Sequence, residues 1–344
     1  MSTGELRPLV KAKKSATIYD VAAKAGVSIG TVSLALNSPM RVRGSTLERI
    51  NAAIDDLRFV PKAEAVVRAR RGVGRIGVIA PFGTYTSFAR RLNGVLGALR
   101  GQSYEIAVYD HEGAGTSLLA SLPIARRLDG LIVMSLPLGD DVVDRLLDKN
   151  LTTVLVELDR PDFSAVTIDD VAGSQMVAEL LVDRGHASFG FIGEGGTKPH
   201  PHNQILQSET RMLGFRAALA RRGQNLPQDH VRLVRHSLAA ATKAAGELLG
   251  LPNRPTAIFA HDDVLASGVL RAAQKHSLRV PEDLAVAGFD DSEIAEHLGL
   301  TSVRQPFEES GKVAAEILLS QMRDGSRSLQ HVTLKLELVE RETT

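Results

Sequence analysis

The chain has 344 residues and a mass of 36.9 kDa, with 44% apolar and 24% charged residues, which is typical of globular proteins and excludes disordered and fibrous classes. Because cysteine is absent, a disulfide framework, a thiolate metal site and a cysteine nucleophile are excluded, and a reducing compartment is indicated. The sequence shows neither a signal peptide nor a run of about 18 apolar residues, so we expect a cytoplasmic protein with no membrane partner.

Charge is distributed unevenly along the chain. Residues 1–75 contain 14 lysines and arginines but only 6 acidic residues, a net charge of +8, whereas the whole chain carries +1. The remaining residues therefore carry −7. A basic region attached to a larger acidic body is typical of a module that binds a polyanion, although a solvated basic surface would have the same charge. The pattern within the basic region distinguishes the two.

Three short helices are predicted in the basic region. Thr17 and Asp20 have the spacing of a capping box, and Ser28 is a second N-cap that follows a turn at Gly26. A third helix is predicted from Ser45. The apolar residues of these helices predict a shared core of Val21, Val27, Val32, Leu36, Leu47, Ile50, Ile54 and Leu57. Two helices joined by a tight turn form a helix-turn-helix, whose second helix fits a DNA major groove about 12 Å wide.

A longer motif runs through these helices. It comprises residues 17–28 (TIYDVAAKAGVS), 31–33 (TVS), 36–37 (LN) and 57–61 (LRFVP). The motif resembles the DNA-binding headpiece of the lactose/galactose repressor (LacI) family. The resemblance implies an all-α helix-turn-helix headpiece that binds double-stranded operator DNA, in preference to a three-helix bundle without a DNA role.

The resemblance also implies which side chains contact DNA. Those expected to position phosphates are Thr17, Ser28, Thr31, Ser33 and Asn37, and those expected at base edges are Ile29, Gly30 and Leu34. The last position is often arginine in the family, and leucine cannot donate a hydrogen bond to guanine. An operator copied from a well-known relative is therefore not expected.

The segment after the headpiece corresponds to the family's hinge, which folds on DNA and wedges a leucine into the minor groove. That position is Arg68 here, preceded by Val67. Arginine prefers a narrow, electronegative minor groove. We therefore expect either weaker DNA kinking than in relatives or a wedge shifted to Val67.

Past residue 75 the sequence alternates between predicted strands and helices. Strands are predicted at residues 75–81, 105–110, 130–134, 153–158, 189–193, 256–260 and 284–289. Helices are predicted at about residues 87–100, 117–127, 140–148, 171–185, 208–222, 237–249, 263–276 and 307–323. Strands rich in Val, Ile and Leu in such an alternation indicate parallel sheets covered on both faces. The length of this region, about 270 residues, favours two α/β subdomains.

The resemblance to the LacI family continues through this body. It rests on residues 159–161 (DRP), 168–173 (IDDVAG), 185–186 (GH), 191–193 (FIG), 211–215 (RMLGF), 281–283 (PED), 288–291 (GFDD) and 304–306 (RQP). It implies a body similar to periplasmic sugar-binding proteins, in which two Rossmann-like subdomains close on a small molecule. Together with the headpiece, the resemblance covers about residues 17–340.

This organisation predicts four regions. They are a flexible basic tail (1–16), the headpiece (17–60), a hinge (61–74) and an effector-binding and dimerisation domain (75–344). Within the last region, the N-subdomain is expected at about 75–160 and 292–322, and the C-subdomain at about 161–291 and 323–344. The chain ends in a strand-like run at residues 332–339 without apolar heptads, so we expect a homodimer and not a tetramer.

Several residues of the body are candidates for binding the effector. The family resemblance points to Arg160, Arg211, Asp262 and Asp263, position at a strand end points to Asp290, and Tyr85 and Phe88 are candidates for an apolar wall. Carboxylates accept hydrogen bonds from adjacent hydroxyls and an arginine donates to ring oxygens, which is a pattern that binds polyols. The alternatives are that Asp262 and Asp290 cap the helices that follow and that the aromatic residues are ordinary core.

Two motifs point to other functions and are set aside. Residues 72–77 spell the G-x-G-x-x-G fingerprint, but they precede a strand, whereas a dinucleotide site needs the fingerprint to open a helix. His200 and His202 lie in a Pro-containing loop without a third ligand at metal-site spacing, and this loop is more typical of a cleft rim. No cofactor, metal or catalytic arrangement is therefore expected.

These observations predict a transcriptional regulator, most simply a repressor, whose operator affinity depends on a small effector such as a sugar or sugar derivative. One alternative is a sugar-binding protein without a DNA role, which would need an export signal. The other is a nucleotide-dependent enzyme, which would need a correctly placed phosphate loop.

Overall fold

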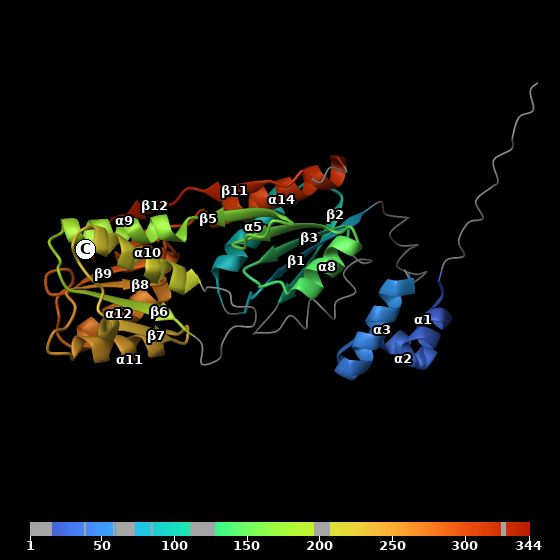
Figure 1. Ribbon diagram of the computed structural model, residues 1–344, viewed down its shortest axis with the longest axis horizontal. Helices are drawn as coiled ribbons and strands as arrows, with labels where there is room; N and C mark the ends of the chain where they lie inside the picture. Colours follow the sequence, from blue (N-terminus) through green and yellow to red (C-terminus); the bar gives the residue numbers. More distant parts are fainter. Residues whose placement is uncertain are drawn as a thin grey trace, which may run out of the picture.

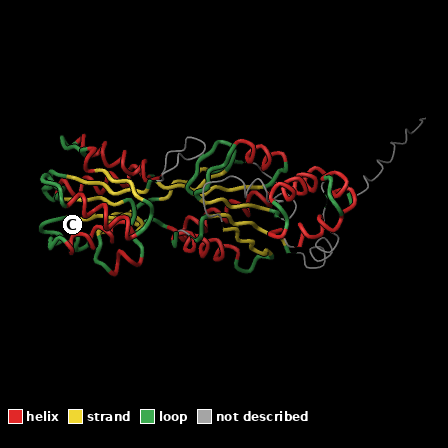
Figure 2. The backbone as a smooth tube through the Cα atoms, turned by 90° about the horizontal axis from the view of Figure 1, so that it is seen from below, coloured by secondary structure: helices red, strands yellow, loops and turns green. Residues whose placement is uncertain are grey.

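The computed structural model describes residues 16–37, 39–57, 59, 73–83, 85–110, 128–195, 207–324 and 328–344. These residues form a small helical head and a body of two α/β lobes, with the head beside the first lobe and remote from the second (Figures 1 and 2). The predicted basic tail and most of the predicted hinge, including Val67 and Arg68, lie outside the described residues.

The head contains three α-helices, as predicted. They are α1 (Ile18–Ala25), α2 (Ile29–Asn37) and α3 (Gly44–Leu57), with a 3-10 turn at Pro39–Arg41. The capping box of Thr17 and Asp20 is present, and Gly26 ends α1 in the left-handed conformation at φ 65°. Ser28 accepts a hydrogen bond from the Thr31 amide at 3.1 Å, which confirms the second cap. All eight predicted core residues lie in or against one apolar cluster.

The first lobe, called here the N-lobe, is built on a parallel sheet in the order β11-β5-β4-β3-β1-β2. Its strands are β1 (Gly74–Ala80), β2 (Tyr104–Asp110), β3 (Gly130–Met134), β4 (Thr152–Val156), β5 (Ser164–Ile168) and β11 (His331–Leu334). Its described helices are α5 (Ser87–Leu99), α8 (Asp140–Asp148) and α14 (Phe307–Asp324). The helix predicted at residues 117–127 lies outside the described residues.

The second lobe, called here the C-lobe, has the strand order β12-β10-β9-β8-β6-β7, which is parallel except for β12. The strands are β6 (Phe189–Glu194), β7 (Val231–Val234), β8 (Ala257–Ala260), β9 (Ala285–Asp290), β10 (Thr301–Arg304) and β12 (Glu337–Val339). The helices are α9 (Asp170–Asp183), α10 (Gln207–Arg221), α11 (Leu238–Leu249), α12 (Asp263–Lys275) and α13 (Glu293–His297), with a 3-10 turn at Gln228–His230.

Each sheet is covered on both faces, which explains why its strands are apolar without alternation. Two apolar clusters lie on the faces of the N-lobe sheet and two on the faces of the C-lobe sheet. The central strands β3 and β8 are buried at every residue. The predicted doubly covered α/β architecture is confirmed.

The chain crosses between the lobes three times, and this corrects the predicted subdomain boundaries. The crossings follow β5, β10 and β11. β5 therefore belongs to the N-lobe and β10 to the C-lobe, and the predicted run at 332–339 is divided into β11 and β12, one strand for each sheet. The sequence predicted neither β5 nor β10 as a strand, and a hydrophobic pattern does not show which sheet a strand joins, so the predicted boundaries were wrong at these points.

The head also contacts the body directly. Asp55 of α3 is buried and its carboxylate lies 2.6 Å from the guanidinium of Arg145 in α8. The Lys149 ammonium donates to the Asp55 carbonyl oxygen at 3.2 Å. Helix α8 therefore links the head to the N-lobe through two charged side chains.

Candidate functional site

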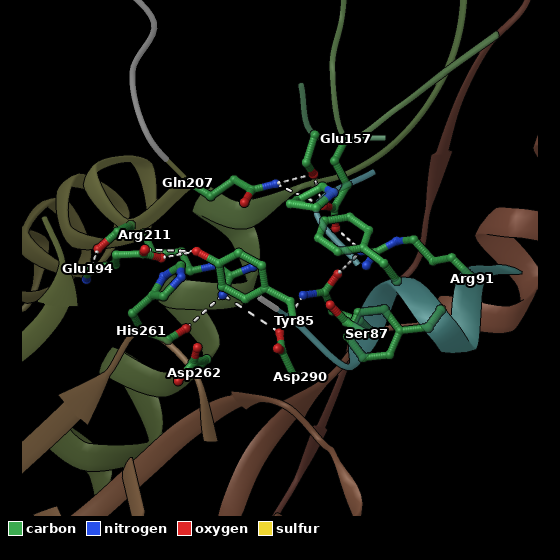
Figure 3. Close-up of a pocket in the computed structure, with 16 residues that line it drawn as sticks. Tyr85, Ser87, Arg91, Glu157, Glu194, Gln207, Arg211, His261, Asp262 and Asp290 are labelled. Carbon is green, nitrogen blue, oxygen red and sulfur yellow. Dashed lines mark hydrogen bonds and ion pairs between the residues drawn. The ribbon is translucent and has the colours of Figure 1, made fainter. Parts of the chain in front are cut away.

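A cavity of about 230 Å³ lies between the lobes, where the carboxyl ends of strands from both sheets meet (Figure 3). Its wall is formed by Pro81, Tyr85, Ser87, Phe88, Arg91, Ser135, Glu157, Glu194, Gln207, Ser208, Arg211, His261, Asp262, Asp290, Gln305 and Phe307. Ligands of parallel α/β folds bind at this end of the strands. The position and the polar lining make it the candidate ligand site.

The backbone is strained at three residues of the cavity wall. Ser135 (φ 50°), Glu157 (φ 58°) and Asp290 (φ 105°) have positive φ, although none of them is glycine. Each follows or ends a buried strand, so the surrounding sheet holds the conformation in place. Such conformations cost about 1–3 kcal/mol each and cluster at ligand sites. The strain supports a functional role for this cavity.

Arg211 lines the cavity, as the sequence predicted, and is buried. Its Nε donates to Asp170 at 2.7 Å, and its Nη1 donates to the His261 carbonyl oxygen at 2.7 Å and lies 3.7 Å from Asp290. The guanidinium also stacks over the Phe289 ring at 3.7 Å. These contacts hold the side chain rigidly, and two of its donor nitrogens, Nε and Nη1, bond to oxygens of the protein itself.

Arg91 is a second arginine of the wall that sequence reasoning missed. It is 2% exposed, pairs with Glu157, and donates to the Gln305 side chain at 3.2 Å. Its guanidinium lies between the rings of Phe88 and Phe307. Burial lowers its pKa to about 9, so the group stays charged at neutral pH. The sequence feature that could have identified Arg91 is its position three residues after Phe88, on the apolar face of a predicted helix.

Tyr85 extends across the cavity from the N-lobe and contacts the C-lobe. Its hydroxyl donates to the Glu194 carboxylate, with distances of 2.8 and 2.6 Å to the two oxygens. Its ring lies 4.7 Å from the His236 ring and 5.9 Å from the Phe88 ring. Burial and the negative charge of Glu194 raise the pKa of the phenol, so it remains a neutral donor. The two lobes are thereby joined within the site.

A second bridge between the lobes lies opposite Tyr85. Gln207 of the C-lobe donates to Glu157 of the N-lobe at 2.9 Å, and Ser135 donates to the same carboxylate oxygen. Figure 3 shows Gln207 and Glu157 at one side of the cavity and Asp262 and Asp290 at the other. The sequence did not single out Glu157, Glu194 or Gln207, because their contacts join residues far apart in the chain, and those of Glu194 and Gln207 with the N-lobe form only when the lobes meet.

Asp262 caps a helix and also lines the cavity. One of its oxygens caps α12 by accepting from the Leu265 amide at 2.8 Å, and the other lies 2.6 Å from His236 Nε2. Although burial opposes it, the bond with His236 lowers the pKa of Asp262, and the pKa of His236 is raised in return. The carboxylate lines the cavity as a charged group.

Asp290 does not cap a helix, because Ser292 occupies the N-cap of α13. The Asp290 carboxylate accepts from the Gln305 side chain at 2.5 Å and faces the cavity. Burial raises its pKa, while the charge of Arg211 acts in the opposite direction. The predicted ligand-facing position of Asp290 is therefore favoured over the alternative.

Two predicted effector residues lie outside the cavity wall. Asp263 is buried behind it, where its oxygens accept from the Ser292 amide at 2.7 Å, the Ser292 hydroxyl at 2.8 Å and the Ser302 hydroxyl at 2.6 Å. Arg160 donates to the Leu138 carbonyl oxygen and to Asp140. Neither residue lines this cavity. Asp263 is adjacent to Asp262 at the end of a strand, but the two side chains face different directions, which only the tertiary fold decides.

The structure describes one of the two motifs that were set aside, the glycine motif, and it agrees with the interpretation that the sequence suggested. Gly74 and Gly77 lie within β1, so the glycine motif runs into a strand. His200 and His202 are outside the described residues. Across the described ranges, no group of three or more His, Asp and Glu residues is arranged to hold a metal ion. Within those ranges, too, no helix is long and apolar enough to span a membrane.

The described part of the head includes most of the residues that were expected to contact DNA. Ile29 and Leu34 of α2 are 42% and 37% exposed, and Gly30 is exposed beside them. Thr17 and Ser28 are exposed as well, whereas Thr31 and Ser33 are partly exposed. The side chain of Asn37 is outside the described set. The exposed face of α2 is therefore apolar, with hydroxyl groups at its start.

A helix-turn-helix head joined to two lobes with a polar cavity between them defines a ligand-responsive, DNA-binding regulator. Residues 17–62 match the family model of bacterial regulatory proteins of the lacI family, and residues 178–344 match a periplasmic binding protein-like domain. The chain is 30% identical over 339 residues to the HTH-type transcriptional repressor PurR of Vibrio cholerae, which covers 95% of this chain and 98% of that one.

Two further comparisons agree. Over 339 residues the chain is 29% identical to the HTH-type transcriptional regulator DegA of Bacillus subtilis, with 95% of this chain and 98% of that one covered. The solved structure of the transcriptional regulator CelR–cellobiose complex has a TM-score of 0.69 at 27% identity and covers 96% of this chain and 100% of that one. This protein belongs to the LacI family and is a DNA-binding transcriptional repressor.

Proposed function

We propose that this repressor binds its operator as a homodimer and that a small carbohydrate in the interlobe cavity controls its operator affinity. The observation that carries the proposal is the cavity itself, whose charged and aromatic side chains come from both lobes. A ligand that contacts both lobes changes the relative stability of the open and closed arrangements of the two lobes. It shifts an equilibrium only as far as its affinities for the two arrangements differ.

The chemistry of the wall supports a polyhydroxy ligand. The carboxylates of Asp262 and Asp290 accept hydrogen bonds from hydroxyls, and the guanidinium groups of Arg91 and Arg211 donate them. Tyr85, Phe88 and Phe307 contribute apolar ring surface to the wall, and Arg91 lies over one face of each phenylalanine ring. The neighbouring CelR structure contains cellobiose, which supports the same ligand class. These contacts bind a ligand without a catalytic step, in keeping with relatives that are repressors and regulators.

A two-stage experiment tests the proposal. A thermal-shift screen of sugars, sugar phosphates and nucleosides should find a stabilising ligand, since a ligand at 100 times its Kd adds about 2.7 kcal/mol. A gel shift with DNA from upstream of the gene should then show altered operator affinity when that ligand is added. Arg211→Ala should remove both effects, whereas Arg160→Ala, outside the cavity, should keep both. The proposal fails if no sugar stabilises the protein or changes DNA binding.

A further inference from the structure

The charges of the cavity wall are not balanced. The wall contains the carboxylates of Glu157, Glu194, Asp262 and Asp290 but, among the described residues, only two arginines. Arg91 is neutralised by Glu157. Arg211 lies 2.7 Å from Asp170, which is outside the wall, and farther from Asp290, at 3.7 Å. Arg91 is therefore paired with Glu157 and Arg211 with Asp170, and only Glu157 of these two carboxylates belongs to the wall.

Three carboxylates remain around Tyr85 (Figure 3). Asp262 has His236 as its neighbour at 2.6 Å, and Asp290 has the more distant Arg211 at 3.7 Å. Glu194 forms no ion pair with any described residue, and its carboxylate accepts from the neutral Tyr85 hydroxyl. All three contribute to raising the pKa of the Tyr85 phenol, after burial, so their charges act on the same part of the cavity.

The wall also contains buried polar atoms that no described residue satisfies. His261 is 6% exposed and its Nδ1 has no hydrogen-bond partner, and the same is true of Arg91 Nε. Burial and the charge of Arg211 lower the pKa of His261 to about 3, so the imidazole is neutral at neutral pH. A buried unsatisfied polar atom costs about 1–3 kcal/mol, so the wall keeps these polar groups at a cost in stability. The acidic residues thus adjoin other buried polar groups of the same wall.

Resting on the proposed function, we propose that the effector is a monosaccharide-sized polyol carrying a protonated amine, an amino sugar, and that Glu194 binds the ammonium group. An ammonium donates up to three hydrogen bonds and neutralises carboxylates that are costly to bury unpaired. A phosphate or carboxylate on the ligand would instead meet three like charges. The volume of about 230 Å³ equals that of roughly eight water molecules, which suits a single sugar ring.

Calorimetry on the full-length protein with matched ligands tests this assignment. The probes are glucosamine, galactosamine and mannosamine, the N-acetylated form of each, and glucose 6-phosphate. At least one amino sugar should bind 10-fold or more tightly than its N-acetylated form, and the phosphate should bind more weakly than either. The inference is overturned if no amino sugar binds more tightly than its neutral counterpart.

Variants identify the residue responsible. Glu194→Gln keeps an acceptor for Tyr85 but removes the charge, so it should weaken the amino sugar at least 10-fold and change the N-acetylated form less than 3-fold. Glu179→Gln removes the same charge from an exposed position on α9 and should change neither. Glu194→Asp, which retains the charge, should retain the preference for the amine if Glu194→Gln folds poorly. Equal losses for both ligands in Glu194→Gln would exclude Glu194 as the ammonium partner.

The outcomes also separate this inference from the proposed function. If neutral sugars bind and change operator affinity while amino sugars do not, the charge assignment is wrong and sugar control stands. If no sugar of either kind binds, both are wrong.

Discussion

Substitution of Asp290 should change effector affinity and folding stability in opposite directions. Asp290 ends β9 at φ 105°, accepts from the Gln305 side chain at 2.5 Å and lies 3.7 Å from Arg211. Burial raises the pKa of Asp290, which means that the folded protein keeps this carboxylate ionised at a cost. Asp290→Asn has nearly the same shape, retains an acceptor for Gln305 and removes the costly charge. We therefore expect its free energy of unfolding at pH 7 to be equal to or above that of the wild type.

Effector affinity should change in the opposite direction. A charge-assisted hydrogen bond contributes about 1.5–3 kcal/mol, so the loss of the carboxylate should weaken effector binding by a factor of about 10 to 150. Calorimetry with the effector found by screening measures this change, and a gel shift without effector should show unchanged operator affinity. A variant that binds effector as tightly as the wild type would place the ligand elsewhere.

The pH dependence gives a second check on the same variant. Because the pKa of Asp290 is raised above its ordinary value of 3.8, the cost of ionisation is fully present above the folded-state pKa and disappears as pH falls toward 4. The stability advantage of Asp290→Asn should therefore shrink between pH 7 and pH 4. An advantage that grows as pH falls would contradict the assigned direction of the shift.

Further predictions concern the rest of the molecule. Operator affinity should fall steeply with salt, since each phosphate contact contributes a log–log slope of about −0.9, and deletion of residues 1–60 should abolish binding in a gel shift. Gly94→Ala should destabilise the protein by roughly 1–3 kcal/mol in chemical denaturation, because the new methyl group collides with the Glu308 carbonyl, whereas Gly97→Ala has open space and should not destabilise. Asp263→Ala should cost roughly 3 kcal/mol by leaving the donors of Ser292 and Ser302 unsatisfied, with full unfolding curves as the measurement.

Local features of this protein could be predicted from the sequence because they depend on neighbours in the chain. The capping box at Thr17 and Asp20, the cap at Ser28 and the headpiece core follow from short spacings and apolar periodicity. The buried parallel strands follow from uninterrupted Val, Ile and Leu. Arg211 and Asp290 were placed at the cavity correctly, the first by a family motif and the second because strand ends of an α/β fold meet at one edge.

Only the tertiary structure decided which strands belong to which lobe and which strand-end side chains face the cavity. Asp262 and Asp263 are adjacent, yet one lines the cavity and the other is buried behind it. Glu194 acquires its partner Tyr85, and Glu157 its contact with Gln207, only when the lobes come together, whereas Arg91 and Glu157 pair within the N-lobe. Contacts between residues more than a hundred positions apart, such as Tyr85 with Glu194, leave no periodic signal in the sequence, so the charge balance of the site is a property of the assembled fold.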